Sequence, residues 1–76
     1  KGEFMAGTAK EVNICGRLIK LGDKVKVKYK GGGTMEGEVT ELWDYENDKI
    51  VQARVKNGWC FHDYDEIIDY TPKENL

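Results

Sequence analysis

Apolar and polar residues alternate along most of the chain from residue 23 onward. In residues 24–30, which read KVKVKYK, the side chains of Val25, Val27 and Tyr29 fall on one side and the lysines on the other. A period of two is typical of a strand with one buried face, and no long window shows the helical period. The pattern predicts strands at 24–30, 34–43, 49–56, 59–62 and 67–70.

Short turn sequences separate these predicted strands. Leu21-Gly22-Asp23 precedes the first strand, three glycines at 31–33 follow it, and Asn57-Gly58 gives the strongest hairpin signal. Residues 63–66 fit one turn of 3₁₀ helix. Five short strands with tight turns predict an all-β fold, a small barrel that closes its own edges.

The segment 12–21 (VNICGRLIKL) is expected to be an extended lead-in that packs over an open side of the barrel. A short helix is the alternative, but Gly16 disfavours it. The 76 residues are enough for one small domain, which we place at 12–72. Residues before Met5 read as a cloning scar, so we expect 1–11 to be scar and flexible tail, and 73–76 to be a second tail.

The lysines of the first strand have partners in the second. If the three glycines form a three-residue loop, Lys28 faces Glu36 and Lys26 faces Glu38. Each facing pair of opposite charges contributes about 0.2–1 kcal/mol. We therefore interpret these two lysines as one side of a solvated, charge-paired face rather than as phosphate ligands. The lysines left unpaired in this register can form a small basic rim: Lys20, Lys24 and Lys30.

The Asn57-Gly58 hairpin sorts a second set of side chains. With a two-residue turn, Val55 faces Cys60 on the inner side, while Trp59 and Phe61 fall on the opposite side. Arg54 and Lys56 share that side, where aromatic rings make cation–π contacts or stack nucleic-acid bases. The alternative is that the 12–21 segment covers these rings as a satellite core.

A further aromatic group surrounds the polar loop at 44–48. The alternation of apolar and polar residues is interrupted between Val39 and Leu42. This interruption predicts a bulge near Thr40-Glu41, which would change the direction of the Trp43 side chain. Trp43 and Tyr45 together with Tyr64 can line a pocket, or they can attach the loop to the barrel.

Charge and cysteine content narrow the functional classes. Residues 1–35 carry eight Lys/Arg and three Asp/Glu (+5), and residues 36–76 carry four and eleven (−7), which gives the net charge of −2. We expect Cys15 and Cys60 to be free thiols. Cys60 with His62 makes only two possible ligands, which are too few to bind zinc. No run of apolar residues is long enough to cross a membrane. No nucleophile and base stand at a recognisable spacing, so we expect neither catalysis nor a cofactor.

Part of the chain resembles a KOW motif. The stretch GDKVKV supplies Gly22, Asp23, Val25 and Val27, and the following strand supplies Gly37, Val39 and Leu42. HDYDEIIDY resembles the closing turn and last strand of NusG-type C-terminal domains, so the likeness covers roughly residues 20–70. It implies a five-stranded SH3-like barrel that acts as a cytoplasmic, non-catalytic adaptor. The hairpin loop departs from the family, because YKGGGTM replaces a Gly-Pro-aromatic group.

Two functional hypotheses follow. The first is a protein-interaction adaptor, monomeric or weakly dimeric, in transcription, translation or a mobile-element system. Its contact residues are predicted to be Trp43, Tyr45, Trp59, Phe61, Tyr64, Arg54 and Lys56. The alternative is binding of RNA or single-stranded DNA by Lys20, Lys24, Lys30, Arg54, Lys56 and Trp59. The net negative charge favours the protein partner, since nucleic-acid readers are usually basic.

Overall fold

The computed structural model describes residues 7–45 and 50–76, with side chains at 9–44 and 51–76, and confirms the all-β class. Its elements are β1 Gly7–Thr8, β2 Glu11–Ile14, β3 Arg17–Lys20, β4 Lys24–Lys28, β5 Thr34–Tyr45, β6 Ile50–Val55, β7 Cys60–His62, β8 Glu66–Thr71 and a 3₁₀ helix at Lys73–Asn75.

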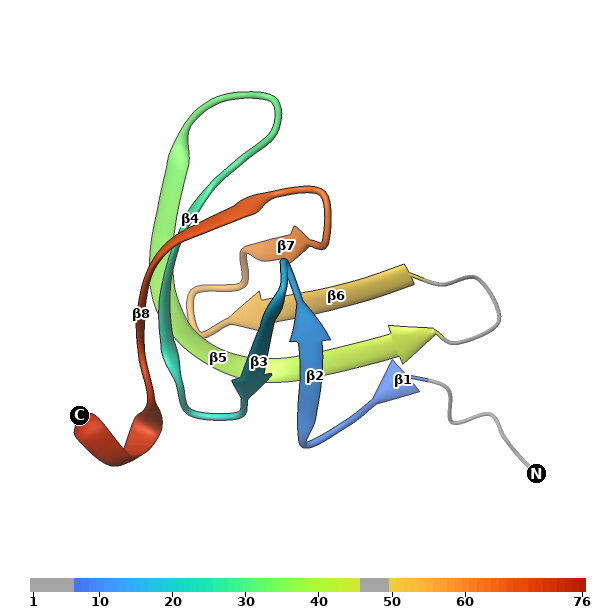
Figure 1. Ribbon diagram of the computed structural model, residues 1–76, viewed down its shortest axis with the longest axis vertical. Coiled ribbons are helices and arrows are strands. Elements are labelled where there is room, and N and C mark those ends of the chain that lie inside the picture. Colours follow the sequence, from blue (N-terminus) through green and yellow to red (C-terminus); the bar gives the residue numbers. More distant parts are fainter. Residues whose placement is uncertain (1–6, 46–49) are drawn as a thin grey trace.

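The larger sheet has the strand order β7-β6-β5-β4-β8, with β1 alongside β5, and every neighbouring pair is antiparallel. The long strand β5 bends, so that its first half pairs with β4 and its second half with β6 (Figure 1). Within the described residues the edge strands β7 and β8 do not pair with each other, so the sheet is open rather than closed into a barrel.

The segment expected to be an extended lead-in is a separate hairpin, β2–β3, that lies across the bent sheet (Figure 1). It turns at Cys15-Gly16, where Cys15 has a φ of 56°, a left-handed conformation that few non-glycine residues adopt. Val12, Ile14 and Ile19 of this hairpin are buried. They pack with the inward side chains of the sheet to form the core, which also contains Val25, Val27, Met35, Val39, Leu42, Ala53, Val55 and Phe61.

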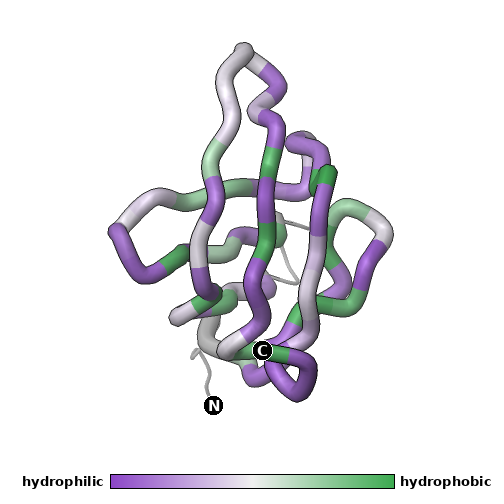
Figure 2. The backbone as a smooth tube through the Cα atoms, turned by 90° about the vertical axis from the view of Figure 1, so that its left-hand side faces the viewer, coloured by the Kyte–Doolittle hydropathy of each residue, from purple (hydrophilic) through white to green (hydrophobic). Residues whose placement is uncertain are grey.

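The β4–β5 register differs by two residues from the predicted one. Lys24 faces Glu38 and Lys26 faces Glu36, because the loop spans 29–33 and is closed by a hydrogen bond from the Tyr29 N–H to the Gly33 carbonyl, 2.9 Å. A shift of two preserves the faces, so the valines of β4 stay buried and its lysines exposed. Hydrophilic and hydrophobic positions alternate along this strand (Figure 2).

The other side of β4 adds further acids to this face. Lys26 faces Asp69 of β8 as well as Glu36 of β5, and Lys28 faces Glu66. The lysines of β4 therefore lie between rows of carboxylates. This arrangement supports the charge-paired interpretation.

The loop of the second hairpin is one residue longer than predicted, and this difference changes which side chains of β7 face inward. Its loop contains three residues, 56–58, and Gly58 has a φ of 95°, as in a type I turn followed by a left-handed residue. Arg54 consequently faces Cys60, and Ala53 faces Phe61. The shift reverses the faces of β7, because side chains alternate along a strand. The two-residue turn placed Phe61 on the outer side, either open to a partner or covered by segment 12–21, whereas the observed register places it in the core, where it is 0% exposed.

The remaining predictions about the positions of structural elements are partly confirmed. The predicted bulge is confirmed, since the β5–β6 register shifts between Val39 and Glu41. Residues 63–65 form a hydrogen-bonded turn rather than a 3₁₀ helix, and the 3₁₀ helix lies at 73–75, where a tail was expected. Part of the expected N-terminal tail is also ordered, because β1 pairs with β5 and the Ala9 N–H donates to Leu42.

Asp23 is a buried carboxylate that joins distant segments. Its side chain, 0% exposed, accepts hydrogen bonds from the Lys20 and Lys73 N–H groups and the Tyr70 hydroxyl, each at 2.8 Å. Burial by itself raises the pKa of Asp23, but these hydrogen bonds outweigh it and lower the pKa. Burial and the bond to Asp23 raise the pKa of Tyr70 to about 12, so its hydroxyl stays protonated.

We predict that Gly37→Ala destabilises the protein by about 1–3 kcal/mol through overpacking. A Cβ at Gly37 would lie 2.9 Å from the Val55 Cβ, across the bend of β5. Urea unfolding followed by tryptophan fluorescence measures this cost. The cost should be smaller in a Val55→Ala background, which keeps the Val55 Cβ but removes the Cγ2 that would also lie 2.9 Å from the new Cβ. Gly31→Ala is the control, since the space at Gly31 is open. An equal cost in both backgrounds would contradict the close approach.

We predict that Asp23→Asn lowers the free energy of unfolding at pH 7 by about 2–3 kcal/mol, because it weakens three buried hydrogen bonds. The folded-state pKa of Asp23 is lowered, so its stabilising effect is complete above the unfolded pKa of about 3.9 and declines as the pH falls below it. Urea titrations of both proteins between pH 7 and pH 2 should show their difference shrinking on acidification. Glu66→Gln, an exposed change, should show neither effect.

Candidate aromatic binding surface

Four ring side chains gather at the end of the sheet where the β4–β5 loop meets the β7–β8 turn. Tyr29 directly follows β4, Trp59 precedes β7, His62 ends β7, and Tyr64 lies in the turn to β8. We call these four residues the aromatic surface. They line one shallow hollow together with Lys30, Gly31, Cys60 and Asp65.

The rings form two pairs. Tyr29 and Trp59 have centroids 6.4 Å apart at an interplanar angle of 42°, and His62 stacks on Tyr64 at 5.0 Å and 6°. Trp59 and Tyr64 are 60% and 63% exposed, although large aromatic side chains are usually among the more buried in a fold. Exposed aromatic residues around a hollow are typical of a binding surface.

Hydrogen bonds fix the orientation of the inner ring. The Tyr29 hydroxyl donates to the Cys60 carbonyl at 2.9 Å. Burial, followed by the nearby Asp65 and Cys60, raises the pKa of Tyr29, so the hydroxyl stays protonated at neutral pH. The Tyr29 ring is therefore held in place, and the more exposed Trp59 ring lies against it.

Asp65 sets the spacing of the surface. Its side chain, 8% exposed, accepts one hydrogen bond from the Lys30 N–H at 2.8 Å and another from the His62 N–H at 2.9 Å. The same carboxylate thus fixes the β4–β5 loop and the end of β7 relative to each other. Nothing in the local sequence marks Asp65 for this role, because hydrogen bonds from one carboxylate to the backbone of distant segments leave no local pattern.

The tip of the β2–β3 hairpin contacts the same turn from behind. The Cys15 N–H donates to an Asp63 carboxylate oxygen, and the Cys15 thiol donates to the Asp65 carbonyl at 3.0 Å. Burial, then the negative charges of Asp63 and Asp65, raise the pKa of Cys15 to about 11. Both cysteines are free, as predicted, and Cys15 serves as a hydrogen-bond donor rather than a nucleophile.

The predicted contact residues divide between different places. Trp59 and Tyr64 belong to the aromatic surface, whereas Phe61 lies in the core. Trp43 instead lies under Arg54, whose guanidinium is 5.3 Å from the Trp43 ring centroid. The remaining two are Lys56, which is exposed on the β6–β7 turn, and Tyr45, whose side chain lies outside the described residues.

The predicted basic residues are largely matched with acids. Ion pairs join Lys20 to Glu74 at 3.5 Å, Lys24 to Glu36 at 3.6 Å and Arg54 to Glu41 at 3.4 Å. The expectation that Lys24 is unpaired was wrong, because the longer β4–β5 loop moves it next to glutamates. Lys30 is the one predicted cation that lies in the hollow of the aromatic surface.

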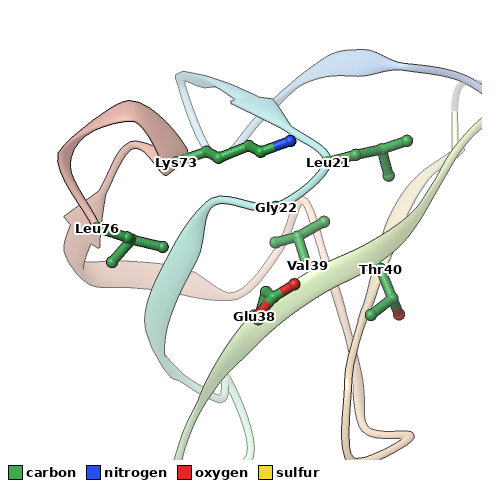
Figure 3. Close-up of a pocket in the computed structure, with 7 residues that line it drawn as sticks. All are labelled: Leu21, Gly22, Glu38, Val39, Thr40, Lys73 and Leu76. Carbon is green, nitrogen blue, oxygen red and sulfur yellow. The ribbon is translucent and has the colours of Figure 1, made fainter.

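A second hollow lies at the opposite end of the sheet, where the β3–β4 turn meets β5 and the C-terminal 3₁₀ helix (Figure 3). The Lys73 side chain extends across Gly22, and Leu21 and Leu76 flank the opening (Figure 3). Its lining mixes Lys73, Glu38 and Thr40 with aliphatic side chains and contains no aromatic ring. The aromatic surface is therefore the stronger candidate for a binding site.

Within residues 9–44 and 51–76, no three His, Cys, Asp or Glu side chains are grouped so as to hold a metal ion. The part of the chain that the structure describes includes no helix with the length and apolarity needed to cross a membrane. Comparisons with protein-family models, curated proteins and solved structures find no match to this chain.

We predict that Cys15 reacts slowly with iodoacetamide at pH 8. A pKa raised from 9.0 to about 11 lowers the thiolate fraction about a hundredfold. Peptide mapping by mass spectrometry would follow alkylation over time in native buffer and in urea. Urea should remove the protection because it separates Cys15 from the Asp63–Asp65 turn. Equal rates at Cys15 in both solutions would contradict the described contacts.

Proposed function

We propose that this chain is a non-catalytic protein-interaction module with an SH3-like arrangement of strands, and that the aromatic surface is its contact site. The architecture is supported by the bent five-stranded antiparallel sheet, whose open side the β2–β3 hairpin covers. The resemblance to KOW domains suggests a cytoplasmic adaptor in transcription, translation or a mobile-element system.

The observation that carries this proposal is the exposure of Trp59 and Tyr64 on either side of one hollow. Burying apolar surface contributes about 25 cal/mol per Å², and tryptophan and tyrosine dominate the energetics of interfaces. Preorganisation increases the affinity that these side chains can provide, because Asp65 and the Tyr29 hydroxyl hold the surrounding backbone in place before binding.

Nucleic-acid binding through Arg54, Lys56 and Trp59 is the alternative. The exposed rings suit base stacking at about 1–3 kcal/mol per base. The charges favour a protein instead, since Arg54, Lys20 and Lys24 each lie within 4 Å of a carboxylate. If four cations of the protein neutralised phosphates of single-stranded nucleic acid, log K would fall with log salt at a slope near −3.

We predict that peptides selected by display on the wild-type protein bind Trp59→Ala/Tyr64→Ala at least about tenfold more weakly, because truncation of such anchors commonly costs more than 1 kcal/mol. Fluorescence anisotropy with labelled peptides measures both affinities. Leu18→Ala/Ile68→Ala is the matched control, since it removes two side chains that are 48% and 45% exposed in β3 and β8.

Urea unfolding would establish that both double variants remain folded. Unchanged affinity in Trp59→Ala/Tyr64→Ala would reject the aromatic surface as the contact site. Binding of a ten-nucleotide oligo(dT) with a steep salt dependence, without any peptide binding, would favour the nucleic-acid alternative.

A further inference from the structure

Lys30 gives the aromatic surface a charged group at a fixed place. Its N–H donates to the buried Asp65 carboxylate at 2.8 Å, so the start of its side chain is held at the hollow. Its ammonium nitrogen lies 6.0 Å from the centroid of the exposed Tyr64 ring. A ligand on this ring therefore meets an ammonium group beside it.

Asp65, the acid that lines the hollow, uses its carboxylate for backbone hydrogen bonds. Both Asp65 oxygens accept backbone hydrogen bonds, and the residue is 8% exposed. Asp63, in the same turn, is directed toward the N–H of Cys15 on the hairpin behind it. The charge presented within the hollow is therefore that of Lys30.

The surrounding charges select among anionic ligands. A nucleic-acid strand carries one phosphate per nucleotide and needs a series of cations along its path. Beyond Lys30, the lysines of β4 face acids: Lys24 pairs with Glu36, and Lys28 faces Glu66 across the sheet. The surface thus matches a ligand with a single carboxylate better than a polyanion.

The ring pairs indicate the shape of this ligand. The Tyr29–Trp59 pair and the His62–Tyr64 pair line the same hollow together with Cys60. Gly31 leaves the loop side open, since nothing lies within 4 Å of where its Cβ would be. Aromatic-lined grooves of this kind accommodate extended peptides, and proline lowers the entropic cost of the extended form.

From these observations, and resting on the proposed function, we infer that the aromatic surface binds an extended protein segment that places a carboxylate next to proline or other apolar side chains. The apolar side chains contact Trp59 and Tyr64, and the carboxylate pairs with the Lys30 ammonium. Lys30 determines the sign of the charge that the partner carries.

The test uses three blocked nine-residue peptides of proline and leucine that differ only at the central residue, which is Asp, Asn or Lys. Titration into ¹⁵N-labelled protein at low salt would give affinities and locate the shifted resonances. The aspartate peptide should bind best and should shift resonances around Trp59 and Tyr64. Lys30→Gln should weaken its binding about twofold to fivefold, the size expected for one exposed ion pair, and abolish the preference over Asn.

Lys28→Gln is the matched control, because this exposed lysine lies two residues away in β4 and should leave the preference intact. Equal binding of all three peptides at the aromatic surface would overturn the inference about charge while the proposed function stands. Tighter binding of the lysine peptide would overturn it as well. If none of the peptides shifts the aromatic surface and an oligo(dT) does, the inference and the proposed function both fail.

Discussion

The buried Asp23 carboxylate holds together the segments on which the rest of the fold depends. Its oxygens accept hydrogen bonds from the end of β3, from Tyr70 of β8 and from the start of the 3₁₀ helix. Its backbone carbonyl accepts from Val39 of β5. A small open sheet has a small core, and one carboxylate with three donors fixes the end of the β2–β3 hairpin beside β8 and the 3₁₀ helix.

Asp65 plays the same part at the opposite end of the molecule. Asp23 joins secondary-structure elements, whereas Asp65 joins the two loop regions that carry the aromatic surface. The exposed rings are therefore mounted on a backbone that hydrogen bonds fix in place. Cys15 extends this support to the covering hairpin, which links the stability of the fold to the shape of the surface.

The outer face of β4 and the aromatic surface differ in how their lysines are paired with acids. On the outer face of β4, lysines lie between glutamates and aspartates, so this face presents mixed charge to solvent. At the aromatic surface, Lys30 instead lies beside exposed rings. The lysine-rich sequence of β4 is thus part of the scaffold, and the lysine just beyond the strand belongs to the proposed site.

The alternation of residues determined the strands and most of the core, because one buried face imposes a period of two wherever a strand packs. It also determined the bulge in β5 and the exposed lysines of β4, which survive a register error of two residues. Tertiary structure decided the loop lengths, and the inclusion of Lys56 in the β6–β7 loop moved Phe61 from the predicted outer side to the core. It also decided the assembly of the aromatic surface and the open edge between β7 and β8, because both depend on contacts such as those of Asp65 between residues far apart in the chain.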